Sequence, residues 1–351
     1  MRLLDRVAQS RAPLLVAHDG NPHSAIRVTG PADYAAAVAT CPLRYVLGDD
    51  LTRTAAELAF ADGDRLASCL DLLRIPASPL WIEWNDAVHQ QVLFDSGSSV
   101  TPPAGAAGRR VGLFLTSSRC GRTGLIRTFW SDDAADDEAE ITLSPLETHV
   151  DLRDPSGADG LERPAMDGGF IGVADAADAG VNALLECARF RFDERWSGYY
   201  SRAAATPPHQ KAVLNASLAA VVRDVPLLFA FFLLLNARDA TRSVSVDRGI
   251  LNQKRLKAGR SPLLDHIEIR ASLGELPTSQ DEEGSGRLRR PSRLHHVRGH
   301  LVRRGLSVFW RSPHVRGRAT LGTVRTRTVC LTFERSGVTR SSRELSSGAA
   351  L

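Results

Sequence analysis

Hydrophobic and polar positions along this 351-residue chain follow two different periods. Apolar residues three or four positions apart are typical of helices with one buried face. This spacing predicts helices over residues 31–39, 51–60, 65–73, 181–195, 209–222 and 226–236. Asp49 and Asp50 are placed to cap the second of these helices, and Pro226 suits the first turn of the last.

Shorter apolar runs bounded by turn residues predict strands over residues 14–17, 80–84, 90–94, 111–116, 125–130 and 264–273. The run from Leu80 to Trp84 shows little alternation, which predicts a strand buried on both faces, with residues 90–94 as its partner. The next two strands flank a turn containing Gly121 and Gly124, so they are expected to form a hairpin. Helices mixed with antiparallel strands indicate an α+β fold.

The most apolar stretch runs from Val225 to Leu235. It has about half of the roughly 20 residues needed to cross a bilayer, so a buried helix is expected and no membrane partner. The first residues lack the apolar core of a signal peptide. Five widely spaced cysteines with no CxxC pair are typical of reduced thiols. Together these features predict a cytoplasmic protein.

Charge divides the chain into two unequal parts. Residues 1–280 contain 29 basic and 35 acidic residues, whereas residues 281–351 contain 15 basic and 5 acidic residues. Between Gly284 and Phe333 there are 12 Arg and four His but no Asp or Glu. Such a block repels itself unless it meets a polyanion, so it is the strongest indication of a partner.

The predicted organisation follows this charge division. It comprises an acidic body over residues 1–273, a Gly- and Pro-containing linker over 274–293, a basic β module over 294–333 and a disordered tail over 334–351. Strands are expected over 294–303, 306–311 and 324–333, with a turn at Arg304 and Gly305. The two-residue strand period then places His296, Arg298 and His300 on one cationic face.

Nucleic-acid binding is the leading functional hypothesis for this module. Arginines are expected to contact phosphates at positions Arg298, Arg303, Arg304, Arg316 and Arg318. His296, His300 and His314 would add hydrogen bonds, and Trp310 would stack on a base or sugar. A short basic helix over residues 253–258, with Asn252 as its N-cap, adds Lys254 and Arg255 as a second contact.

Two alternatives remain open at this point. The basic face also suits docking on an acidic patch of the body or of another protein. His296, His300 and His314 are enough imidazoles for a zinc-dependent hydrolase, although no carboxylate lies nearby and the spacing matches no metalloprotease signature.

Enzymatic motifs are missing from the sequence. It contains no GxxxxGK[ST], GxGxxG or GxSxG pattern. Cys120 begins a loop similar to that of cysteine phosphatases, but Ile126 stands where the sixth residue after the cysteine must be Arg. The sequence therefore predicts no cofactor and no catalytic residue, and a non-enzymatic role is favoured.

One resemblance adds a biological setting. The segment from His295 to His300, then Trp310, then Pro313 to Gly317, resembles the C-terminal motif of uncharacterised phage and prophage-type bacterial proteins. The stretch from Leu251 to Leu263 is similar to the one that precedes the motif in those proteins. The resemblance implies a place in phage or mobile-element biology and carries no mechanism.

Overall fold

The computed structural model describes fifteen segments of the chain: residues 2–10, 14–16, 26–28, 32–61, 63–95, 109–131, 141–152, 170–171, 182–185, 187–193, 218–272, 293–297, 299–311, 314–316 and 318–323. Arg298, most of the predicted helix over 209–222, nearly all of the predicted linker, the predicted strand over 324–333 and the predicted tail lie outside these residues. The chain forms two compact units. Residues 1–275 and 298–313 make the first, and residues 276–297 and 314–351 make the second.

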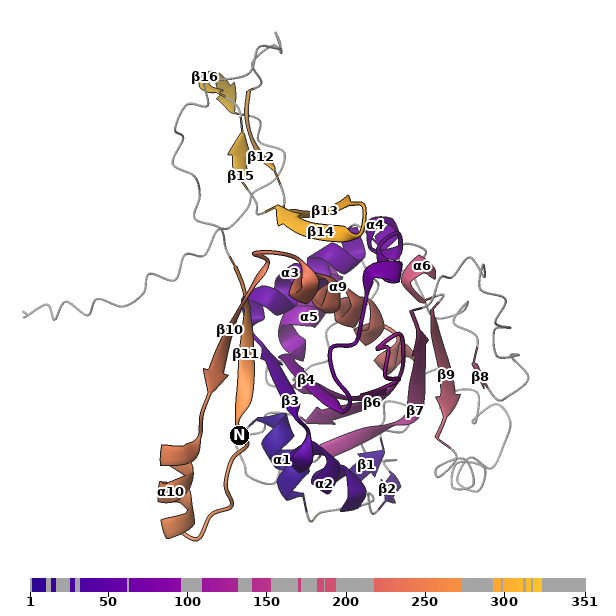
Figure 1. Cartoon of the computed structure of the whole chain (residues 1–351), viewed down its shortest axis with the longest axis vertical. Helices are drawn as coiled ribbons and strands as arrows, with labels where there is room; N and C mark the ends of the chain where they lie inside the picture. The colour runs from indigo at the N-terminus through magenta and orange to yellow at the C-terminus, as the bar shows by residue number, and fades with distance from the viewer. Residues whose placement is uncertain are drawn as a thin grey trace, which may run out of the picture. The chain divides into compact units, whose positions relative to one another are not determined.

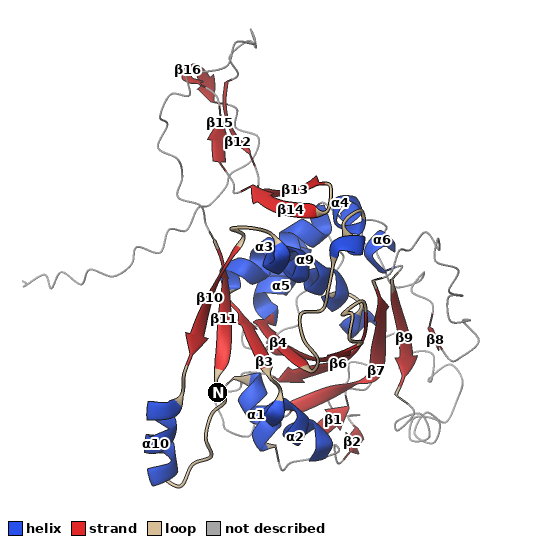
Figure 2. Ribbon diagram, viewed as in Figure 1, coloured by secondary structure: helices blue, strands red, loops and turns tan. Residues whose placement is uncertain are grey.

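The first unit is built on one mixed β-sheet (Figures 1 and 2). Its strands follow the spatial order β10 (Thr241–Val246), β11 (His266–Ala271), β3 (Leu43–Leu47), β4 (Leu80–Asn85), β5 (Arg110–Ser117), β6 (Thr123–Ser131), β7 (Ile141–Asp151), β1 (Leu14–Val16) and β2 (Ile26–Val28). In addition, β9 (Ala188–Phe192) pairs with β7, and β8 (Phe170–Ile171) pairs with β9. Strand β3 runs parallel to β4 and β11, whereas the strands from β4 to β7 are antiparallel.

Helices cover both faces of this sheet (Figure 2). One face carries α3 (Asp49–Ala61), α4 (Gly63–Ala67), α5 (Asp86–Asp95), α6 (Asn182–Leu185) and α9 (Asp224–Asn236). The opposite face carries α1 (Leu3–Gln9) and α2 (Ala32–Thr40), whose apolar side chains form a second, smaller core with the sheet. The α+β class predicted from the sequence is confirmed.

Strand β4 is buried on both faces, as its apolar run predicted. Leu80, Ile82 and Trp84 belong to the larger core, and Trp81 on the other face belongs to the smaller one. Helices on both sides of the sheet remove both sets of side chains from water, which explains the lack of polar alternation.

Helix α9 confirms the buried helix predicted around residues 225–235. All residues from Asp224 to Leu234 are buried, and Pro226 lies in the first turn. The apolar stretch Leu218–Asn236 has the length and composition of a membrane span, but 78% of its most apolar window lies buried inside the structure.

Two predicted elements have the wrong secondary structure. Residues 90–94 belong to helix α5, because His89, Val92 and Leu93 have helical spacing and are buried together. The predicted helix over 181–195 is a four-residue helix, α6, followed by strand β9. In β9 the buried Ala188 and Phe190 alternate with half-buried arginines, which is the strand period.

The predicted hairpin over 111–130 is confirmed as β5 and β6. Gly121 in its turn has φ +67, a conformation that favours glycine. A Cβ at this position would also lie 2.6 Å from the carbonyl oxygen of Ile75, so the turn packs against the chain that precedes β4.

Strands β10 and β11 are joined by helix α10 (Gly249–Lys257). The basic helix predicted over 253–258 is therefore present, but it begins earlier and Asn252 is not its N-cap. The Asn252 side chain instead donates to the carbonyl oxygen of Leu263 and accepts from its N–H, at 2.8 and 2.7 Å. These two bonds fix the connection back to β11.

The predicted strand over 294–303 is two strands that belong to different units. Strand β12 (Arg293–Val297) lies in the second unit with β15 (His314–Arg316) and β16 (Arg318–Thr323). Strand β13 (His300–Arg304) lies in the first unit and forms a hairpin with β14 (Ser307–Arg311). The predicted turn at Gly305 is confirmed, and its φ of +59 suits glycine.

Candidate functional site

Basic residues stand opposite one another in the sheet of the second unit. Strand β12 pairs antiparallel with β15, which places His295 opposite Arg316 and Val297 opposite His314. On its other side β12 pairs parallel with β16, which places Arg293 opposite Arg318. Three short strands therefore concentrate cationic residues from two separate stretches of sequence, with His296 in the register between His295 and Val297.

The described residues of the predicted cationic face, His296 and His300, do not lie on one strand. His296 lies on β12 and His300 lies on β13, which are strands of different sheets in different units. The two-residue period applies only within one continuous strand, and the strand ends between these residues.

The hairpin β13–β14 gives several predicted site residues another role. The Arg303 guanidinium donates to both carboxylate oxygens of Asp71, at 2.8 and 2.9 Å, and to the carbonyl oxygen of Ser68. The hydrogen bond to Asp71 raises the pKa of Arg303. Trp310 is half-buried and packs against the larger core beside the buried Leu301, while Arg304 is exposed. Part of the basic segment is thus docked on an acidic residue of its own unit.

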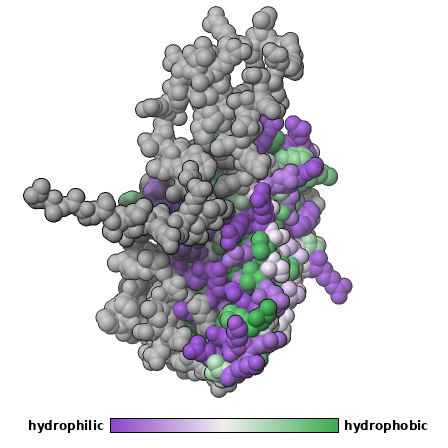
Figure 3. All heavy atoms as spheres, turned by 90° about the vertical axis from the view of Figure 1, so that its left-hand side faces the viewer, coloured by the Kyte–Doolittle hydropathy of each residue, from purple (hydrophilic) through white to green (hydrophobic). Residues whose placement is uncertain are grey.

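Helix α10 exposes both charged and apolar side chains. Lys254 is exposed, and Arg255 is half-buried and donates to the carbonyl oxygen of Ser261 at 2.8 Å. No residue of the helix is buried, and Ile250 and Leu256 are 77% and 60% exposed. Figure 3 turns this side of the molecule toward the viewer and shows hydrophobic side chains among hydrophilic ones.

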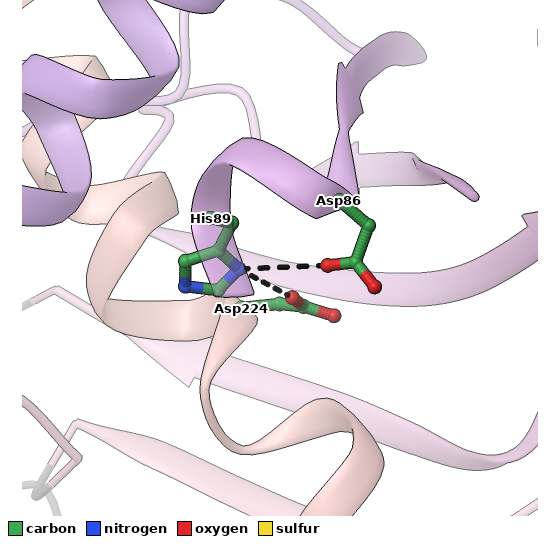
Figure 4. A group of neighbouring side chains, drawn as sticks. All are labelled: Asp86, His89 and Asp224. Atoms are coloured by element: carbon green, nitrogen blue, oxygen red, sulfur yellow. Dashed lines mark ion pairs between the residues drawn. The ribbon is translucent and has the colours of Figure 1, made fainter. Parts of the chain in front are cut away.

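A buried polar cluster lies elsewhere in the first unit, and the sequence did not predict it. Asp86 and His89 come from the first turn of α5, and Asp224 comes from the first turn of α9 (Figure 4). His89 Nδ1 lies 3.8 Å from Asp86 Oδ1 and 3.7 Å from Asp224 Oδ1. The only sign of this cluster in the sequence is the spacing of Asp86 and His89, three positions apart on a helix. Asp224 joins them only through tertiary packing.

The two carboxylates of this cluster differ in the direction of their pKa shifts. Burial acts to raise the pKa of Asp86, but the neighbouring His89 and the charge of Arg109, whose Nε lies 3.4 Å away, outweigh burial and lower it. Burial, followed by the charge of Asp86, raises the pKa of Asp224 well above its usual range. The two carboxylates of one buried cluster therefore have pKa values shifted in opposite directions.

Comparisons with protein-family models, curated proteins and solved structures gave no match for this chain.

Proposed function

We propose that this protein binds nucleic acid without catalysis, through the phosphate backbone, and that the sheet β12–β15–β16 carries the contact. The setting suggested by the resemblance is an accessory or regulatory role in phage or prophage biology, in the cytoplasm. The observation behind the proposal is the register that sets Arg293 opposite Arg318 and His295 opposite Arg316.

Opposed basic residues are unfavourable in a sheet that has no anionic partner. In an antiparallel pair such as β12 and β15, directly opposite residues have Cβ atoms only about 4.5–5.5 Å apart, so like charges at such positions destabilise the sheet. No acidic residue occurs from Gly284 to Phe333 to offset this repulsion. A line of phosphates supplies the missing negative charge, and binding releases the counterions condensed on the nucleic acid.

The other predicted contact residues lie on the hairpin β13–β14 and on α10, and the exposure of each side chain decides the role that we propose for it. Arg303 is committed to Asp71, and Trp310 packs on the core, so both are assigned to anchoring the hairpin. Arg304 and Lys254 are exposed and are secondary contacts. Contacts to the backbone alone give little sequence preference.

Salt dependence tests this proposal. Fluorescence anisotropy with labelled duplex DNA, single-stranded DNA and RNA is expected to show binding that weakens steeply as salt rises. The double variant Arg293→Ala/Arg318→Ala is expected to reduce the slope of log K against log salt by about 2, because each backbone contact contributes about 0.9. Binding should weaken equally for all sequences.

The matched control is Arg53→Ala/Arg65→Ala, which removes two charges from exposed positions on α3 and α4. It should leave the salt slope unchanged, as should Arg303→Ala. Absence of binding at low salt, or equal slopes for the two double variants, would reject the sheet as the binding surface.

A protein partner is the second candidate function, and the exposed side of α10 favours it. Ile250, Leu251 and Leu256 lie beside Lys254 and Lys257, a combination that suits an acidic amphipathic segment of another protein. A labelled peptide with leucine and glutamate at helical spacing is the probe.

The α10 hypothesis predicts that the Ile250→Ser/Leu256→Ser variant binds the peptide at least tenfold more weakly than the wild type. Full burial of one aliphatic side chain is worth about 1.5–3 kcal/mol, and tenfold corresponds to about 1.4 kcal/mol. Anisotropy measures the affinity, and Arg53→Ala is the control. Equal affinity in wild type and variant would exclude α10 as the docking surface.

A further inference from the structure

The cluster of Asp86, His89 and Asp224 has an unusual combination of burial and missing hydrogen bonds. Their side chains are 2%, 0% and 6% exposed. Among the described residues, neither ring nitrogen of His89 has a hydrogen-bond partner, nor does Asp224 Oδ2. Leaving a buried donor or acceptor unsatisfied costs about 1–3 kcal/mol, so a cluster of such atoms requires an explanation.

The geometry brings the three groups toward one point. One nitrogen of His89 and one oxygen from each carboxylate lie within 4.8 Å of one another. Figure 4 shows the imidazole with Nδ1 directed toward both carboxylates. The distances from Nδ1 to the two oxygens, 3.7 and 3.8 Å, are too long for hydrogen bonds.

These distances suit a shared cation. Nitrogen and carboxylate oxygen ligands bind zinc at about 2.0–2.2 Å in tetrahedral geometry, so two ligand atoms of one ion are separated by about 3.3–3.6 Å. The two separations from His89 Nδ1, 3.7 and 3.8 Å, exceed this range by only a few tenths of an ångström, which small side-chain rotations would close. A divalent ion would also add positive charge next to both carboxylates, of which Asp86 pairs with Arg109.

We propose that Asp86, His89 and Asp224 form a site for a divalent first-row transition metal ion such as Zn²⁺. One imidazole and two carboxylates are a borderline donor set that suits zinc, iron or manganese better than calcium. Asp224 Oδ2 is the oxygen available for a second bond from the same carboxylate.

Neighbouring side chains act as the outer shell of this site. Gln90 donates to Asp86 Oδ1 at 3.3 Å, and Arg109 lies 3.4 Å from Asp86 Oδ2. Such partners orient ligating carboxylates. Aromatic rings also surround the imidazole, with Phe60 stacked on it at 6.3 Å and Trp84 at its edge at 6.4 Å.

The ion's role follows from the elements that it joins. It links the start of α5, which directly follows the central strand β4, to the start of α9, the most buried helix described. Since all three ligands are buried, the site is structural and holds two helices that are far apart in the sequence.

The test uses the full chain without an affinity tag, after dialysis against a chelator. Titration calorimetry with Zn²⁺ should show a stoichiometric site, and Zn²⁺ should raise the melting temperature. Co²⁺ should give visible absorption bands typical of a bound ion. His89→Gln and Asp224→Asn are expected to weaken Zn²⁺ binding at least tenfold and to remove the Co²⁺ bands.

The control is His149→Gln, which removes a half-exposed histidine from β7. It should bind like the wild type, which shows that removing a histidine outside the cluster has no effect, whereas zinc held by the histidines in residues 295–314 would survive His89→Gln. If the ligand variants do not fold, Gln90→Ala serves instead, with an expected loss of about tenfold through the outer shell.

Two outcomes would overturn the metal site. The first is wild-type protein that gives no Co²⁺ bands and no thermal shift with Zn²⁺. The second is His89→Gln or Gln90→Ala binding both ions like the wild type. A cluster that is only a histidine shared by two carboxylates would give the first outcome.

Discussion

Replacing Glu83 with alanine is expected to lower the free energy of unfolding by about 3–5 kcal/mol, because it removes a fully buried carboxylate and leaves a largely buried arginine without its partner. Glu83 is fully buried on β4 and pairs with Arg110 of β5. Its two oxygens also accept the backbone N–H groups of Leu3 and Leu4, at 3.0 and 2.9 Å. One carboxylate therefore joins two strands to the first turn of α1.

Urea unfolding followed by circular dichroism measures this effect. Glu83→Gln keeps the shape and an acceptor oxygen but loses the charge. The free energy of unfolding of this variant should therefore lie between those of the wild type and Glu83→Ala. Glu57→Ala, at an exposed position on α3, should change stability by no more than about 0.5 kcal/mol. A loss below about 1 kcal/mol for Glu83→Ala would contradict the proposed role of the carboxylate.

Lowering the pH is expected to reduce the free energy of unfolding by about 2 kcal/mol through the protonation of Glu147 alone. The strand register places Arg127 of β6 and Arg191 of β9 on either side of this residue. Burial acts to raise the pKa of Glu147, but His149, Arg127 and Arg191 outweigh it and lower the pKa to about 2. A group whose pKa falls on folding stabilises the protein above its unfolded pKa, here 4.5, and loses that contribution as the pH drops toward 2.

The expected loss of about 2 kcal/mol takes into account that solvent screens the charges around Glu147. A shift from 4.5 to about 2 corresponds to about 3 kcal/mol, and partial exposure of His149 and Arg191 reduces it to about 2 kcal/mol. Urea unfolding at pH 6, 4.5, 3 and 2 measures the loss. Glu147→Gln should be less stable at pH 6 and should lose less stability between pH 4.5 and 2; parallel curves for both proteins would rule out Glu147 as the source.

Sequence patterns predicted elements whose period is long or unambiguous. The unbroken apolar run in β4 and the apolar helix α9 are confirmed, and so is the hairpin around Gly121. The wrong predictions concern short segments whose apolar residues fit both the helical and the strand period. Residues 90–94 and 188–192 have few side chains to separate a helix from a strand, and packing against neighbouring elements decided each case.

Charge was also visible in the sequence, but the arrangement of the charges was not. The acid-free stretch from Gly284 to Phe333 indicated a basic segment. The structure divides its described part between a hairpin that docks through Arg303 on Asp71 and a sheet that sets Arg293 opposite Arg318. A sequence contains the number of basic residues, whereas strand pairing decides which of them become neighbours.

The sequence by itself determined the type of most long elements, the α+β class and the uneven distribution of charge, because these depend on local periodicity and composition. Only the tertiary structure decided the partners of the buried polar groups. Glu83 reaches Leu3, and Asp224 joins Asp86 beside His89. Each pairing joins segments far apart in the chain, and the low-dielectric interior makes the choice of partner matter energetically.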